Sequence, residues 1–250
     1  MDLFEIVAHR GVATTYPENT LPAFKKAIEL GADAIELDVR LTKDKIPVVY
    51  HYYYLDEITS LTGPIFNYTY QQLQQARFLN AHTGVDLPKI CTLAEVLEAV
   101  GGKIGLEIEI KGPESEVVAI IGDILRSFKN LWETIEVTSY EISLLLGIKD
   151  QCLGITTDLL YPRSEPWMKL DVVGYEALHK AKMAQARAVH LHPNQLSDEV
   201  VQLVRNSGVE IHAWDVNDEP AFETIVKYNI PKICTDHFEL AANFRNRILV

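Results

Sequence analysis

Residues 20–41 read TLPAFKKAIELGADAIELDVRL and predict a helix followed directly by a strand. Phe24 and Ile28 recur at helical spacing, and Gly31 stands where a helix of this length ends. Residues 34–41 form the next strand, after a connection too short for anything but a tight αβ turn. This helix-then-strand unit is the element from which α/β folds are built.

The same alternation continues along most of the chain. A helical pattern follows each predicted strand, and the strands fall at residues 4–9, 34–40, 104–110, 135–139, 152–157, 188–192, 210–216 and 232–235. Eight such units in 250 residues predict an α/β fold of the (β/α)₈ TIM-barrel type, and we expect one domain over residues 1–250. An open doubly wound sheet is the alternative, but the glycine-rich loop that usually follows its first strand is missing.

One region departs from the alternation. Residues 46–51 come too soon after the strand at 34–41 for a helix to intervene, so the two runs predict an antiparallel arm. Residues 52–90 are irregular and contain five tyrosines. We interpret 52–90 as a small insertion or lid over the mouth of the barrel, whose aromatic residues either contact substrate or pack the insertion.

Composition limits the class of partner. The chain has 23 Lys and Arg against 35 Asp and Glu, a formal net charge of −12, which argues against binding to nucleic acid or to an anionic membrane. An anionic small molecule is not excluded, because a local site or a metal ion can override the global field. Cys91, Cys152 and Cys234 form no CxxC motif, and we expect buried thiols in a reducing compartment.

The sequence contains no secretory signal and no apolar stretch of membrane-spanning length. We therefore expect a soluble, cytoplasmic protein without stable membrane insertion. The sequence does not indicate an oligomeric state.

Acidic residues collect at the predicted strand ends, where the active site of a barrel forms. Glu36 and Asp38 are two residues apart, so both project from one face of their strand, and Glu109 ends another strand. Such a set of carboxylates suits Mg²⁺, Ca²⁺ or Mn²⁺. The structural alternative is that Glu36 and Asp38 only pair with Arg40 or lie on an exposed edge.

Basic residues stand beside these acids. His9 and His51 end strands and can act as general acid and base, although a single strand histidine is more often structural. Arg10 and Lys111 add positive charge of the kind that a phosphate ester requires. His190 and His192 form a possible transition-metal pair on a further strand.

The chain resembles the glycerophosphodiester phosphodiesterases over nearly its whole length. The matching segments are His9-Arg10-Gly11, Pro17-Glu18-Asn19-Thr20, Glu36-x-Asp38-Val39, the turn Thr42-Lys43-Asp44, Val48-Val49-x-His51, Lys89 to Glu95, Glu109-Ile110-Lys111, Ser139-Tyr140, Trp214 to Asn217 and Thr235-Asp236. The first 51 residues carry the most specific part of the match.

The resemblance implies hydrolysis of a small glycerophosphodiester to an alcohol and sn-glycerol 3-phosphate, with a divalent metal ion as cofactor. It implies metal ligands at Glu36, Asp38 and Glu109, an acid–base pair at His9 and His51, phosphate contacts at Arg10 and Lys111, mouth residues at Glu18 and Asn19 that cap the first helix and support the site, and a supporting role for Glu107 around the metal. From their places at strand ends, His192 and Trp214 are further candidates for substrate binding.

Two departures from the family pattern concern the substrate. Tyr52 stands where the family usually has Asp, and Asp215 where it usually has Thr. Three rival functions stay open: a lysophospholipid phosphodiesterase on the same barrel, a metallohydrolase that uses His190 and His192, and a barrel that binds ligands without catalysis.

Overall fold

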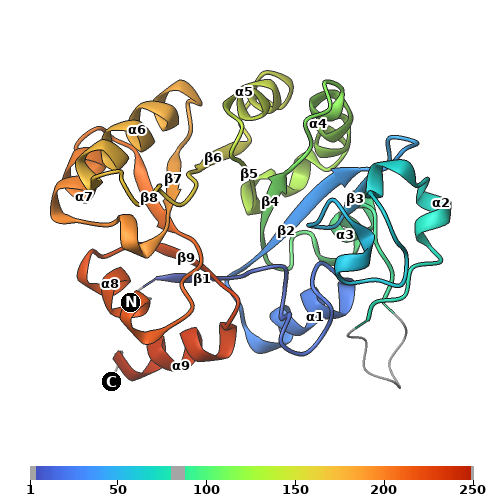
Figure 1. The fold of residues 1–250 in the computed structure, drawn as a ribbon, viewed down its shortest axis with the longest axis horizontal. Coiled ribbons are helices and arrows are strands. Elements are labelled where there is room, and N and C mark those ends of the chain that lie inside the picture. Colours follow the sequence, from blue (N-terminus) through green and yellow to red (C-terminus); the bar gives the residue numbers. More distant parts are fainter. Residues whose placement is uncertain (1–3, 80–87, 249–250) are drawn as a thin grey trace.

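The structure is a computed structural model that describes residues 4–79 and 88–248. Eight parallel strands close into a barrel, and helices surround it (Figure 1). The barrel strands are β1 (Glu5–Ala8), β2 (Ala34–Leu41), β4 (Gly105–Ile110), β5 (Ile135–Ser139), β6 (Thr156–Leu160), β7 (Ala188–Leu191), β8 (Glu210–Ala213) and β9 (Lys232–Thr235). Each strand pairs with the next in this order, and β1 pairs with both β2 and β9, which confirms the predicted (β/α)₈ barrel.

The outer ring consists of amphipathic helices whose apolar sides pack against the barrel strands. These helices are α1 (Leu21–Leu30), α3 (Leu93–Val100), α4 (Val117–Ser127), α5 (Ile142–Gln151), α6 (Leu170–Met183), α7 (Asp198–Arg205), α8 (Glu219–Lys227) and α9 (Phe238–Ile248). Two short 3₁₀ helices, η3 (Lys129–Thr134) and η4 (Pro193–Gln195), complete the connections around them. No helix within residues 4–79 and 88–248 is both long enough and apolar enough to cross a membrane.

The predicted arm is present. Strand β3 (Pro47–Val49) runs antiparallel to β2, with Val49 opposite Val39. It leads into η1 (Leu55–Glu57), η2 (Ile65–Asn67) and α2 (Tyr70–Leu73), which share a small apolar cluster of their own that includes Tyr50. Residues 80–87 of the predicted insertion lie outside the described residues.

One strand was predicted in the wrong place. The run from Cys152 was assigned to a strand at 152–157, but Cys152 ends α5 and Gly154 turns the chain with a φ of 103°. Strand β6 begins only at Thr156, because the residues before it are needed to close the helix and reverse direction. The shift brings Asp158 into the middle of β6, fully buried.

The loop after β1 is pressed against the first helix. Gly11 has a φ of 81°, and a Cβ at this position would lie 2.8 Å from the backbone carbon of Ala23. Only glycine permits both this backbone conformation and this close approach. The contact fixes the loop that carries His9 and Arg10 relative to α1.

Candidate active site

Three carboxylates meet where β2 and β4 end. Asp38 is opposite Glu109 in the strand register, and Glu36 precedes Asp38 by two residues on the same face of β2. Oxygen atoms of Glu36, Asp38 and Glu109 all lie within 4.8 Å of one another, and all three residues are buried. We call these three residues, with the neighbouring Arg10 and Lys111, the mouth cluster.

The two basic residues of the mouth cluster bind its carboxylates directly. Lys111 Nζ lies 2.6 Å from Glu109 Oε1 and 3.2 Å from Asp38 Oδ1. Arg10 Nε lies 3.2 Å from Asp38 Oδ2, while its Nη1 donates to Glu18 Oε1 at 2.8 Å. Asp38 thus contacts both cations. The cluster holds three carboxylates and only these two cationic side chains.

This imbalance is reflected in the pKa values. Burial opposes ionisation of Asp38, but Lys111 and Arg10 outweigh it and hold the pKa of Asp38 below its ordinary range. Burial and the nearby charge of Asp38 raise the pKa of Glu109 to about 7 and that of Glu36 well above its usual value. The cluster therefore holds more negative charge than its own cations stabilise.

The residues present fit a hard divalent cation. Glu36 Oε1 is buried and has no hydrogen-bond partner, although buried carboxylate oxygens normally have one. The donor set consists of carboxylate oxygens alone, which suits Mg²⁺, Ca²⁺ or Mn²⁺.

His9 is held by a carboxylate that sequence reasoning did not include among the site residues. Its Nδ1 lies 2.6 Å from Asp236 Oδ1, at the end of β9, and its Nε2 lies 3.8 Å from Glu36 Oε2. Asn217 Nδ2 donates to the other oxygen of Asp236 at 2.7 Å. The hydrogen bond from His9 lowers the pKa of Asp236 to about 2, so this carboxylate stays charged at neutral pH.

The only sequence feature that pointed to Asp236 is the Thr235-Asp236 match to the family pattern. The pair joins opposite ends of the chain, 227 residues apart, and no local pattern records such a distance.

The second histidine, His51, is half-buried. Its Nδ1 is buried and has no hydrogen-bond partner, and the ring of Tyr52 meets the imidazole edge to face at 4.6 Å. Burial, together with the positive charge of Arg10, lowers the pKa of His51 to about 3. Arg40 does not pair with Glu36 or Asp38, the structural alternative raised above; its Nε donates to the backbone oxygen of His51 at 2.7 Å.

Glu18 and Asn19 were expected to cap the first helix and to support the site, and the capping role is wrong. Thr20 occupies the N-cap position, without a side-chain capping bond. Asn19, with a φ of 58°, instead donates its amide to Asp38 Oδ2 at 2.8 Å and accepts from the Asp38 backbone N–H. Both side chains face the mouth cluster because the loop folds back over the strand ends.

Glu107, expected near the metal ligands, belongs to a second buried layer. It faces His190, whose Nδ1 lies 3.3 Å from Glu107 Oε1. Most residues of this layer come from the starts and middles of the strands and lie deeper in the barrel than Asp38 and Glu109, while Glu107 is level with Glu36 in the strand register. We call it the lower cluster, and its members are Glu107, Glu136, Asp158, Arg187, His190, His212 and Lys232.

The acids of the lower cluster are paired with cations. Arg187 Nη2 bonds both Asp158 Oδ2 and Glu136 Oε2, and Lys232 Nζ lies 2.6 Å from Glu136 Oε1. Burial opposes ionisation of Asp158, yet the hydrogen bonds from His190 and Arg187 hold its pKa below the ordinary range. Glu136, Asp158, His190 and His212 are close enough to hold a metal ion, but the two carboxylates already have these partners.

The possible His190–His192 metal pair is not formed. His190 points into the lower cluster, whereas His192 Nδ1 accepts a hydrogen bond from the Asn194 backbone at the start of η4. His192 packs edge to face on Trp214, with ring centroids 5.6 Å apart. His192 and Trp214 thus lie together at the rim, above β7 and β8.

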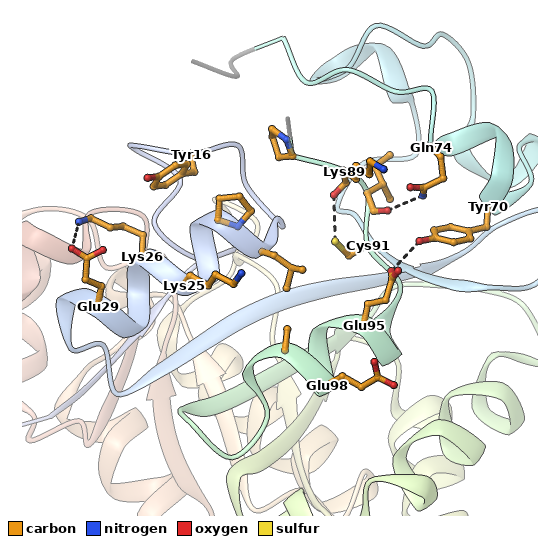
Figure 2. Close-up of a pocket in the computed structure, with 15 residues that line it drawn as sticks. Tyr16, Lys25, Lys26, Glu29, Tyr70, Gln74, Lys89, Cys91, Glu95 and Glu98 are labelled. Carbon is orange, nitrogen blue, oxygen red and sulfur yellow. Dashed lines mark hydrogen bonds and ion pairs between the residues drawn. The ribbon is translucent and has the colours of Figure 1, made fainter. Parts of the chain in front are cut away.

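A separate hollow of 770 Å³ lies outside the barrel, between α1, α3 and the chain around α2 (Figure 2). Tyr70 reaches across it to Glu95, and Gln74 donates to the Ile90 backbone. It contains none of the predicted metal or acid–base residues. The chemistry is therefore to be sought at the barrel mouth.

Comparison with known proteins assigns the family. A sequence model of the glycerophosphoryl diester phosphodiesterase family matches residues 9–240. The chain belongs to this family. It is therefore an enzyme, a phosphodiesterase that hydrolyses glycerophosphodiesters.

Similar proteins support the assignment over the full length. A glycerophosphodiester phosphodiesterase of Caldanaerobacter subterraneus is 32% identical over 247 residues, covering 95% of this chain and 96% of that one. A putative glycerophosphoryl diester phosphodiesterase of Agrobacterium tumefaciens has the same fold, with a TM-score of 0.85, 18% identity and 98% of each chain covered. An Oleispira antarctica phosphodiesterase in complex with the product sn-glycerol-3-phosphate has a TM-score of 0.79 at 22% identity, over 96% of this chain and 95% of that one.

Proposed function

We propose that this phosphodiesterase hydrolyses glycerophosphodiesters with a divalent metal ion held by Glu36, Asp38 and Glu109, and releases an alcohol and sn-glycerol 3-phosphate. The observation that carries the proposal is the mouth cluster, in which three carboxylates face only two cations and one buried oxygen of Glu36 has no partner. The product found with the Oleispira antarctica relative supports the same product here.

A bound divalent cation would polarise the phosphate and offset the charge that grows on its oxygens. Arg10 and Lys111 would also stabilise the negative charge on the phosphate oxygens. Both side chains lie at the carboxylates that would hold the ion, so they stand next to the phosphate position. Glu18 and Asn19 hold Arg10 and Asp38 in place through their hydrogen bonds.

His9 and His51 carry the proton transfers. Asp236, charged at neutral pH, fixes the orientation of the His9 ring. His51 is half-buried and its pKa is lowered, so it is neutral at pH 7 and able to accept a proton. One ring takes the proton of the attacking hydroxyl and the other returns a proton to the leaving alcohol.

We also propose that residues 1–250 are a single domain in which 52–90 is an insertion beside the mouth. Tyr52 supports this role, because its ring contacts His51 and lies 5.8 Å from the Arg10 guanidinium.

The test is release of sn-glycerol 3-phosphate from glycerophosphocholine and glycerophosphoethanolamine, after EDTA treatment and after return of Mg²⁺, Ca²⁺ or Mn²⁺. We expect EDTA to abolish turnover and at least one ion to restore it. Direct Mn²⁺ binding, measured by calorimetry, should weaken in Glu36→Gln and persist in the control Glu29→Gln, an exposed residue on α1.

Turnover that survives complete metal removal contradicts the metal role. Turnover of lysophospholipids alone identifies the lysophospholipid enzyme; Tyr53 and Tyr54, exposed beside Tyr52, would then be the first residues to test for acyl-chain contact. A folded protein that binds Mn²⁺ but turns over neither class is a binding protein.

A further inference from the structure

A second hollow lies at the rim of the mouth, on the side away from the proposed metal ligands. It has a volume of 360 Å³, a size typical of small-molecule sites, and is enclosed by the ends of β7 and β8, η4 and the start of α8. Its polar lining includes Arg163, His192, Asn194, Asp215 and Asn217. We call it the rim hollow.

The rim hollow is joined to the proposed acid–base residue by hydrogen bonds. Asn217 Nδ2 donates to Asp215 Oδ1 at 2.6 Å and to Asp236 Oδ2 at 2.7 Å. Asp236 in turn binds His9. The hydrogen-bonded chain Asp215–Asn217–Asp236–His9 thus links the lining of the rim hollow to the proposed acid–base residue.

Asp215 is placed in this hollow by an unusual backbone. Its φ is 59°, a conformation that few residues other than glycine adopt, although aspartate tolerates it. The bond from Asn217 and an ion pair with Arg163 hold it there. Strained backbone that the surroundings enforce is characteristic of binding and catalytic sites.

The charges of Arg163 and Asp215 in the hollow offset each other. The Asp218 carboxylate has no cationic partner among the described residues and accepts the backbone N–H of Ala221 as the cap of α8. Burial lowers the pKa of His192, which is therefore neutral at pH 7. The Arg163–Asp215 pair therefore has no excess charge for an ammonium group or for a second phosphate.

What such a lining offers is donors and acceptors side by side. Guanidinium and amide N–H groups donate, while carboxylate and amide oxygens accept. Adjacent hydroxyl groups, each both donor and acceptor, match this arrangement. Trp214 lies beside His192 and Arg163 and adds an apolar ring of the kind that covers carbon-bound hydrogens.

We propose that the rim hollow binds the leaving alcohol of the phosphodiester and selects alcohols that carry neighbouring hydroxyl groups, with Asp215 and Arg163 as the selecting residues. This inference rests on the proposed function, because it assigns the hollow to one end of that substrate. The other end, the glycerol phosphate, is assigned to the mouth cluster.

The experiment compares two substrates that differ only in the leaving alcohol: glycerophosphoglycerol, and its propyl analogue without hydroxyl groups on that end. The ratio of their kcat/KM values is measured for the wild type, Asp215→Asn, Arg163→Gln and the control Asp123→Asn. Asparagine is chosen because it tolerates the positive φ of Asp215. Asp123 is the control because, like Asp215, it forms an ion pair with an arginine.

We expect the wild type to favour the hydroxylated substrate at least tenfold, and both rim variants to reduce that ratio to threefold or less. Asp123→Asn should keep the wild-type ratio. Equal losses on both substrates would show that Asp215 acts only through Asn217 and Asp236, and would overturn the proposal.

A third substrate separates the two ends of the diester. A glycerophosphoglycerol analogue lacking a hydroxyl on the glycerol 3-phosphate end should respond to Asp215→Asn as the parent substrate does. If Asp215→Asn lowers kcat/KM for the parent substrate but not for this analogue, the hollow binds the glycerol 3-phosphate end. The proposal is then wrong. If the wild type with restored metal turns over no glycerophosphodiester, the proposed function itself fails, and this inference with it.

Discussion

The barrel contains two layers of buried acids, and they differ in how their charge is balanced. In the lower cluster, Arg187 and Lys232 bind Glu136 and Asp158 directly. Its third acid, Glu107, faces His190; burial opposes the charged imidazole, but Glu107 and Asp158 outweigh it and raise the pKa of His190. The lower cluster thus places an imidazole against its third acid, whose own pKa burial raises to about 8.

In the mouth cluster the two imidazoles are differently engaged. Arg10 and Lys111 face Glu36, Asp38 and Glu109, while His9 is bound by Asp236 and the pKa of His51 is lowered to about 3. Acids and histidines within bonding distance therefore do not by themselves indicate a metal site. The distinguishing feature is that the mouth cluster places a third carboxylate, Glu36, beside two cations whose ion pairs are with Glu18, Asp38 and Glu109.

The largest effect is expected from the histidines at the mouth. His9→Ala and His51→Ala should each lower turnover about 10²–10⁴-fold, since each removes one proton transfer. The thermal unfolding midpoint should stay near that of the wild type, and His179→Ala on α6 serves as the control. Near-normal turnover in both variants would remove the acid–base assignment.

Substitutions in the lower cluster should instead change the free energy of unfolding. Lys232→Met leaves Glu136 buried without its ammonium partner, and we expect a loss of about 3–5 kcal/mol in unfolding free energy. Replacing both partners, Lys232→Met with Glu136→Met, should recover most of the loss, because no uncompensated charge is left. Denaturant unfolding measures both. A larger loss in the double variant would show that the pair itself is required.

Asp236→Asn tests the link between the two ends of the chain. The hydrogen bond to His9 survives only in part and the negative charge is lost, so kcat should fall about 10²-fold, at the lower end of the acid–base range. KM and the unfolding midpoint should change little. An effect confined to KM would mean that Asp236 contacts substrate rather than orienting His9.

The smallest effect is the acid dependence of stability. The pKa of Asp158 is lowered from its ordinary value of 3.8, so its stabilisation is present above that value and is lost as the pH falls below it. One proton contributes a slope of about 1.4 kcal/mol per pH unit between the unfolded and folded pKa values. Urea unfolding from pH 5 to pH 2 should show the slope, and Asp158→Asn should flatten it. An unchanged slope in the variant would assign acid lability to other carboxylates.

Local periodicity determined much of this protein. The alternation of helical and strand patterns is enough to predict the barrel, the antiparallel arm and the common face of Glu36 and Asp38, because these depend on residues close in sequence. The misplaced strand at 152–157 shows the limit of this approach, since an apolar run that ends a helix resembles one that begins a strand.

Only the tertiary structure decided how the acids are divided. Glu107 and Glu109 lie two residues apart on one face of β4, opposite Glu36 and Asp38, yet they have different partners: Glu107 faces His190 of β7, whereas Glu109 binds Lys111. Closure of the barrel brings Asp236 to His9 and Lys232 to Glu136. Register and closure are fixed by hydrogen bonds and packing between distant segments, and sequence spacing does not record them.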